Sequence, residues 1–150
     1  MLRVNKLADY GTVVMVTLAR LHADLVNAKQ ISLETHIPLP TVTKILKRLA
    51  QRGLVKSKQG IGGGYILAES PEHISVIDII EAMDSKLDLI ECTIPGLCSL
   101  ENFCLAKGNW QIIARAIRES LQTITLEKLA QPNVAFKIHI DTVTTKPLLN

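Results

Sequence analysis

Hydrophobic positions in the first third of the chain repeat with the period of a helix. Residues 8–22 are apolar on most sides, which predicts a buried first helix. Residues 28–36 give a second, shorter helical pattern, and Ile37-Pro38-Leu39-Pro40 predicts a turn, because proline suits the start of a helix but cannot continue one. The next segment, 41–52, has one apolar stripe, formed by Val42, Ile45, Leu46 and Leu49. Gly53 is expected to end this third helix.

The pattern changes to two short strands after Gly53. Residues 54–58 and 65–67 are predicted strands, and the connection 59–64 holds four glycines in six residues. Glycine permits positive φ angles and close approach of the backbone. A phosphate-binding nucleotide loop is the alternative, but the run lacks a Gly-Lys-Ser/Thr ending and joins strand to strand. The elements together predict a winged helix-turn-helix, whose second helix enters the major groove of DNA.

The second half of the chain is predicted to be mostly helical. Ser75 precedes a helix with a capping-box-like start that ends near Asp84. Residues 105–130 predict one helix of about 26 residues, roughly twice the average length. Such a helix in a small domain favours packing against a second copy of the chain, although a long core helix in a monomer is the alternative. Residues 132–150 are expected to form a flexible tail.

The predicted fold class is therefore mainly α with a small β-hairpin wing. The expected organisation is a winged helix-turn-helix DNA-binding domain over residues 1–84, a loop over 85–105, a dimerisation helix over 106–131 and the tail over 132–150.

Charge is distributed unevenly, which strengthens the prediction of a nucleic-acid partner. The net charge of +3 conceals ten basic and three acidic residues in 1–68, against seven basic and eleven acidic residues in 69–150. Six basic residues and no acidic residue lie between Pro38 and Gly60. This is the footprint of a polyanion partner, unless the residues only form a solvated helix face.

The length and hydropathy indicate one cytoplasmic domain with no membrane partner. A chain of 150 residues, 47% of them hydrophobic, is enough for one core. No stretch approaches 18 uninterrupted apolar residues, and the N-terminus lacks the pattern of a signal peptide. We therefore expect the cytoplasm, where thiols stay reduced.

The cysteines are the strongest candidate chemistry. Cys92, Cys98 and Cys104 are the only cysteines, and five residues separate each from the next. An odd number of thiols in a reducing compartment argues against a disulfide scaffold. Thiolates bind iron–sulfur clusters, zinc or copper(I). A cluster, a structural zinc and a thiol switch all remain open, and a fourth ligand is missing.

The wing sequence Gly60-Ile-Gly-Gly-Gly-Tyr65, the evenly spaced cysteines and the long helical segment together resemble the IscR/NsrR family of iron–sulfur transcriptional regulators. The resemblance covers about residues 1–130 and is greatest to regulators of the SUF iron–sulfur assembly operon. It implies a homodimer on a palindromic site in double-stranded DNA, with a 2Fe–2S or 4Fe–4S cluster in each subunit and no small-molecule substrate. A nitric-oxide-sensing repressor and a zinc or thiol redox switch are the alternatives. No catalytic constellation was found, so we do not expect an enzyme.

The resemblance implies that the three cysteines are cluster ligands. In one branch of the family the fourth ligand is a histidine three residues after the last cysteine, but here that residue is Lys107, and a protonated amine does not bind metal. In the nitric-oxide sensors it is an N-terminal aspartate, which matches Asp9. The alternative for Asp9 is an acid favoured by the dipole of its helix. The four histidines (His22, His36, His73 and His139) are expected to be surface or partly buried residues.

The DNA contacts implied by the resemblance depart from the family pattern at two positions. The wing arginine of many members is replaced by Gln59, with Lys58 beside it, and a recognition-helix glutamate is replaced by Thr43. Thr41 and Lys44 are expected to reach base edges. Four further basic residues are expected on phosphates. The full predicted set is Thr41, Thr43, Lys44, Lys47, Arg48, Arg52, Lys56, Lys58, Gln59, Gly60, Gly62 and Gly63.

Overall fold

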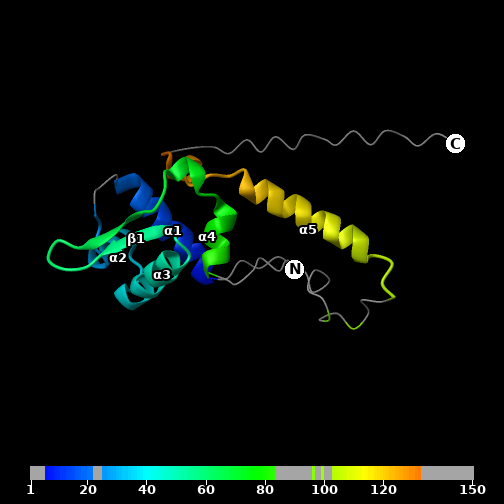
Figure 1. Cartoon of the computed structure of the whole chain (residues 1–150), viewed down its shortest axis with the longest axis horizontal. Coiled ribbons are helices and arrows are strands. Elements are labelled where there is room, and N and C mark those ends of the chain that lie inside the picture. The colour runs from blue at the N-terminus through cyan, green and yellow to red at the C-terminus, as the bar shows by residue number, and fades with distance from the viewer. Residues whose placement is uncertain (1–5, 22–24, 84–95, 97–98, 100–102, 133–150) are drawn as a thin grey trace.

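Three helices form the N-terminal part of the fold in the computed structural model of the chain, which describes residues 6–21, 25–83, 96, 99 and 103–132. They are α1 (Lys6–Leu21), α2 (Ala28–Thr35) and α3 (Leu39–Gln51). Figure 1 shows them gathered at one end of the molecule. The three predicted helices are confirmed. Helix α3 starts two residues earlier than predicted, because Pro40 fits the first turn, where backbone N–H groups have no partner within the helix.

The ends of these helices follow the chemistry of the local sequence. Asn27 begins α2 by accepting a hydrogen bond from the Gln30 backbone N–H at 2.8 Å. His36 ends α2 in the left-handed region, with φ 56°. Gly53 follows α3 with φ 75°, which confirms its predicted role, because glycine adopts this conformation without steric cost.

The apolar stripe of α3 lies in the centre of the core. Val42, Ile45, Leu46 and Leu49 have no exposed surface and pack in a cluster with residues of α1, α2 and a later helix, α4 (Val76–Met83). Burying one such side chain contributes about 1.5–3 kcal/mol. The stripe therefore fixes the rotation of α3 about its own axis and leaves its other faces to solvent.

The wing is a two-stranded antiparallel hairpin. Strand β1 (Val55–Lys58) pairs with β2 (Gly64–Leu67) in a register that joins Val55 to Leu67 and Lys58 to Gly64. Val26 pairs with Tyr65 through two backbone hydrogen bonds of 3.0 and 2.8 Å, which attaches the hairpin to the segment before α2. The predicted strand–glycine-loop–strand arrangement is confirmed.

Helix α4 begins with a reciprocal cap, as predicted. It follows a short 3-10 helix, η1 (Pro71–His73). The backbone N–H and the hydroxyl of Ser75 both donate to the Asp78 carboxylate, and the Asp78 N–H donates back to the Ser75 hydroxyl at 3.3 Å. Two groups at the helix start are thereby satisfied together.

The predicted single helix over 105–130 is wrong. The chain forms α5 (Lys107–Gln122) and α6 (Leu126–Ala130), separated at 123–125. Thr125 pairs with Ser75, the Val76 N–H donates to the Ile124 carbonyl at 2.9 Å, and the Leu126 N–H donates to the Ile74 carbonyl at 2.8 Å. These bonds to the start of α4 replace those of a continuous helix, and the Thr125 side chain caps α6.

Helix α6 therefore packs with the DNA-binding part rather than extending α5. Leu126 is fully buried in the same core as the α3 stripe, and α6 contacts α1 and η1. The last residues of the predicted dimerisation helix over 106–131 thus form α6, which packs against the core. The predicted tail lies outside the described residues, apart from Pro132.

Helix α5 projects away from this body (Figure 1). Its described attachment includes an ion pair between Arg118 and Glu81 on α4. The Glu81 carboxylate raises the pKa of Arg118, first through this hydrogen bond and then through its charge. Of the helices in the described ranges, none has the length and apolar character needed to span a bilayer.

Candidate nucleic-acid interface

The solvent-facing side of α3 carries the residues predicted to contact DNA. Lys44 and Lys47 are exposed, and Thr41 is partly exposed. Thr43 is also partly exposed, but its hydroxyl donates to the Leu39 carbonyl of its own helix at 2.9 Å. No acidic residue interrupts this surface. The solvent-facing side of α3 therefore presents the ammonium groups of Lys44 and Lys47 and the partly exposed side chain of Thr41.

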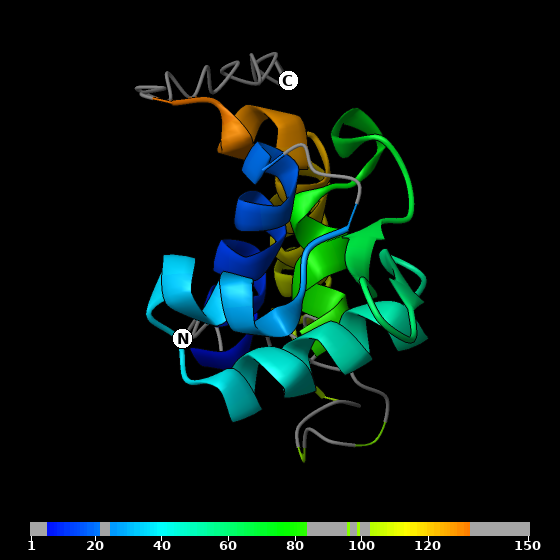
Figure 2. The same cartoon turned by 90° about the vertical axis from the view of Figure 1, so that its left-hand side faces the viewer.

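The wing continues the basic surface beyond the end of α3. Arg52, Lys56, Lys58 and Gln59 are all exposed. The Leu54 N–H donates to the Leu49 carbonyl at 2.9 Å, which fixes where β1 leaves the helix. In Figure 2, α3 and the hairpin lie next to each other on the face turned toward the viewer. The fold thus brings the elements that carry the predicted contact residues, α3 and the wing, next to each other.

The glycines of the wing have two different roles. Gly60 and Gly62 have φ angles of 102° and 76°, which side chains disfavour. Gly63 lacks room for a side chain, because a Cβ would lie 2.3 Å from the Lys58 carbonyl oxygen. The predicted residues Gly60, Gly62 and Gly63 therefore shape the wing, whatever else they contact.

Arg48 has a role that the sequence did not reveal. Its side chain is half-buried, and its Nη1 donates to the backbone carbonyl of Met83. This carbonyl belongs to the last turn of α4, where backbone acceptors lack partners within the helix. Arg48 thus joins the second helix of the helix-turn-helix to the end of α4, which directly precedes the predicted cysteine loop.

The predicted metal ligands are only partly within the described residues. Cys104 is a free, half-buried thiol shortly before α5, and Asp9 is exposed in the first turn of α1. Cys92 and Cys98 lie outside the described residues. Within those ranges, no three histidine, cysteine or acidic side chains come together as a metal site. The donor types still suit iron, since thiolates are cluster ligands, so the cysteine assignment stays a prediction.

The histidines offer no competing metal site in the part of the chain that the structure describes. His36 is exposed at the end of α2, and His73 is exposed with its Nε2 3.8 Å from Glu72. His22 and His139 lie outside the described residues.

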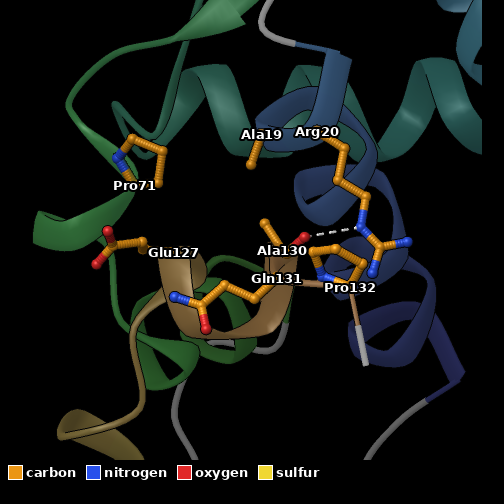
Figure 3. Close-up of a pocket in the computed structure, with 7 residues that line it drawn as sticks. All are labelled: Ala19, Arg20, Pro71, Glu127, Ala130, Gln131 and Pro132. Atoms are coloured by element: carbon orange, nitrogen blue, oxygen red, sulfur yellow. Dashed lines mark hydrogen bonds between the residues drawn. The ribbon is translucent and has the colours of Figure 1, made fainter. Parts of the chain in front are cut away.

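A shallow cavity of about 500 Å³ lies on the side of α1, η1 and α6 (Figure 3). The Arg20 Nε donates to the Ala130 carbonyl at 3.0 Å beside it. None of the predicted DNA-contact residues or metal ligands lines this cavity. It is therefore separate from the basic surface.

A helix-turn-helix with a basic second helix, followed by a glycine-tipped hairpin on the same core, defines a winged helix-turn-helix DNA-binding protein. The match to a family agrees. The family model for Rrf2, described as an iron-dependent transcriptional regulator, matches residues 4–132, and the chain belongs to the Rrf2 family. The predicted resemblance to IscR-type regulators is confirmed, and so is a regulator rather than an enzyme.

Individual relatives show similarity over most of their lengths. The HTH-type transcriptional regulator IscR of Escherichia coli is 30% identical over 129 residues, which cover 85% of this chain and 80% of that protein. Among solved structures, CymR, the global cysteine regulator of B. subtilis, has a TM-score of 0.71 and 31% identity over 87% of this chain and 97% of its own. IscR of T. potens has a TM-score of 0.65 and 31% identity over 85% of each chain.

Proposed function

We propose that this DNA-binding regulator is a homodimeric repressor of iron–sulfur assembly genes that senses an iron–sulfur cluster held by Cys92, Cys98 and Cys104. The observation that carries the proposal is the combination of the basic α3–wing surface with the isolated cysteine triad. The family description, an iron-dependent transcriptional regulator, supports it.

In this proposal, the DNA contacts divide between sequence reading and positioning. Lys44 and Thr41 reach base edges in the major groove, where lysine favours guanine acceptors and threonine contacts a thymine methyl group. Lys47, Arg52, Lys56 and Lys58 bind phosphates, which place the protein on the duplex without specifying its sequence. The wing approaches the DNA backbone through Gln59 and the glycines Gly60, Gly62 and Gly63.

The three cysteine thiolates would hold the cluster, and Asp9 is the proposed fourth ligand. A bound cluster would supply an iron centre that responds to iron supply or redox state. The Asp9 carboxylate is exposed and is a hard oxygen donor, so it would bind iron weakly and exchange readily. Arg48 of α3 donates to the Met83 carbonyl at the end of α4. In this proposal, a movement of the cysteine segment that follows α4 is transmitted to α3 through this bond.

The proposed dimer is supported by exposed apolar side chains on and just before α5. Trp110, Ile112 and Ile113 are 44%, 69% and 43% exposed, and Phe103 and Leu105 just before the helix are 86% and 101% exposed. Several large apolar side chains exposed along one projecting helix are typical of an interaction surface. A second copy of the chain fits best, because two-fold symmetry of the protein matches a palindromic DNA site.

The proposal is tested by purifying the full chain without oxygen and measuring its visible spectrum, iron and sulfide. We expect a coloured protein with bound iron and sulfide, a loss of colour in Cys92→Ser and Cys104→Ser, and a weakened cluster in Asp9→Ala. In wild type, duplex binding should differ between the cluster-bound and the cluster-free protein. In the cysteine variants, the same treatment should leave duplex binding unchanged. A colourless reconstituted protein, with promoter binding that Cys92→Ser leaves unchanged in both redox states, would rule out cluster sensing.

A zinc or thiol switch is the second candidate, favoured by the half-buried free thiol of Cys104 and by similarity to a cysteine regulator. Metal analysis of the same preparation distinguishes the two candidates, because bound zinc without iron or sulfide would exclude an iron–sulfur cluster. Release of DNA on nitrosylation of a bound cluster would instead identify a nitric-oxide sensor.

A further inference from the structure

Ile61 is an isoleucine whose whole side chain lies in solvent. Its exposure is 111%, the highest among the large hydrophobic residues that the structure describes. The other isoleucines of the DNA-binding part mostly pack in the core, and Ile31, Ile45 and Ile79 have no exposed surface. The fold therefore gains no burial from an apolar side chain at position 61.

The wing holds Ile61 at its tip in a defined turn. The Gly63 N–H donates to the Gly60 carbonyl at 2.9 Å, which closes a four-residue turn with Ile61 and Gly62 at its centre. Gly62 has φ 76°, the conformation that a type II turn requires at its third residue. Ile61 occupies the second residue, where an ordinary negative φ is needed, and its φ is not positive.

The neighbours of Ile61 have no side chains. Residues 60, 62, 63 and 64 are all glycine, so Ile61 is the only side chain between Gln59 and Tyr65. The hairpin is also tightly closed below the tip, because a Cβ on Gly63 would lie 2.3 Å from the Lys58 carbonyl oxygen and 2.9 Å from that of Gly60. The result is a narrow hairpin whose tip carries one exposed apolar side chain, that of Ile61.

The residues near Ile61 indicate which kind of partner its side chain contacts. Single exposed hydrophobic residues are common and need no explanation by themselves. Here, however, the strand leading to the tip carries exposed Lys56 and Lys58, and Arg52 precedes it. These cations attract a polyanion, and the narrow tip is small enough to enter a groove. Proteins that bind the minor groove combine basic contacts with apolar wedges, isoleucine among them, that partly unstack a base step.

We infer that Ile61 is a minor-groove wedge, which the wing inserts at one base step in each half-site. The inference rests on the proposed DNA binding and adds a specificity-determining residue to it. Pyrimidine–purine steps unstack most easily, so Ile61 favours sites that place such a step under the wing.

The experiment uses the full-length protein and a duplex that it selects from a random pool. 2-Aminopurine, placed in turn at the purines of one half-site, reports unstacking by its fluorescence. Wild type should brighten the probe at one step. Ile61→Ala should abolish that signal and weaken binding on the order of tenfold, whereas Ile61→Leu should retain both. The thermal melting of the free variants should match wild type, because the side chain contacts nothing in the fold.

Lys58→Gln is the matched control on the same hairpin. It should lower the slope of log K against log salt by about 0.9 and keep the fluorescence signal. Equal binding and fluorescence in Ile61→Ala and wild type, with Lys58→Gln still weakened, would overturn the wedge and leave the proposed function standing. A change in oligomeric mass caused by Ile61→Ala, with an unchanged probe signal, would make the tip a protein contact and also overturn it. Absence of any selected duplex would remove the proposed function itself.

Discussion

At the scale of single residues, the glycine run of the wing combines two physical requirements. The sequence indicated positive φ angles and close backbone approach for the run as a whole. The structure separates them: Gly60 and Gly62 need the conformation, whereas Gly63 and Gly64 need the space. The obstructing atoms differ in origin: those near Gly63 belong to residues 58–60 of the same hairpin, whereas those near Gly64 belong to Val26, far away in the chain.

Gly64 gives a direct test of that space. A Cβ there would lie 2.8 Å from the Val26 carbonyl oxygen, and this backbone cannot move without breaking the Val26–Tyr65 pair. We expect Gly64→Ala to lower the free energy of unfolding by about 1–3 kcal/mol, measured by urea denaturation.

Gly108→Ala is the matched control for the Gly64 variant. A Cβ at Gly108 meets no atom within 4 Å, and alanine favours the helix, so stability should stay level or rise by up to about 1 kcal/mol. Equal stabilities for Gly64→Ala and wild type would contradict the steric role of Gly64.

At the scale of elements, α3 was predicted almost completely from its own sequence, but its connection to α4 was not. Four apolar residues at helical spacing were enough to identify its buried face. The bond from Arg48 to Met83 spans 35 residues of sequence, so no local pattern could indicate it. The sequence therefore placed Arg48 only among the phosphate-binding residues.

Arg48→Met distinguishes support of α3 from binding of phosphate. Methionine keeps the apolar stem but removes the donor to the Met83 carbonyl, so the free energy of unfolding should fall by about 1 kcal/mol. The dependence of duplex affinity on salt should change little, since the guanidinium is engaged within the protein.

Lys47→Met is the comparison, because Lys47 is exposed on the same helix. It should leave stability unchanged and lower the salt slope by about 0.9. A similar loss of slope in Arg48→Met, without loss of stability, would assign Arg48 to a phosphate instead.

At the scale of the whole molecule, the body of the fold contrasts with α5, which extends from it (Figure 1). Helix α5 carries large apolar side chains that are exposed to solvent. Most buried side chains of the core belong to α1, α2, α3, α4 and α6, and the N-terminal half of α5 has no cover among the described residues. This imbalance is what the proposed dimer would resolve.

Ile113→Asp tests the dimer. Ile113 is 43% exposed, and its apolar surface would be buried between two copies, so an aspartate there should favour the monomer. Sedimentation velocity should show about half the wild-type mass, and affinity for a palindromic duplex should fall because one half-site is lost.

Gln111→Asp adds the same charge at an exposed polar position of the same helix and should remain dimeric. Wild type that sediments as a monomer at all concentrations would refute the proposed dimer directly.

The sequence by itself determined the elements whose signals are local: the helices of the DNA-binding part, the helix end at Gly53, the cap at Ser75, the glycine-tipped wing and the run of basic residues. Helical period, proline at a helix start and glycine at a turn act within a few residues, so they can be recognised without knowing the fold. The tertiary structure alone decided where the last helical segment breaks. Thr125 and its neighbours bond to residues 74–76, about fifty positions earlier, and Leu126 enters the core. Burial and long-range backbone pairing outweighed the local preference for one continuous helix.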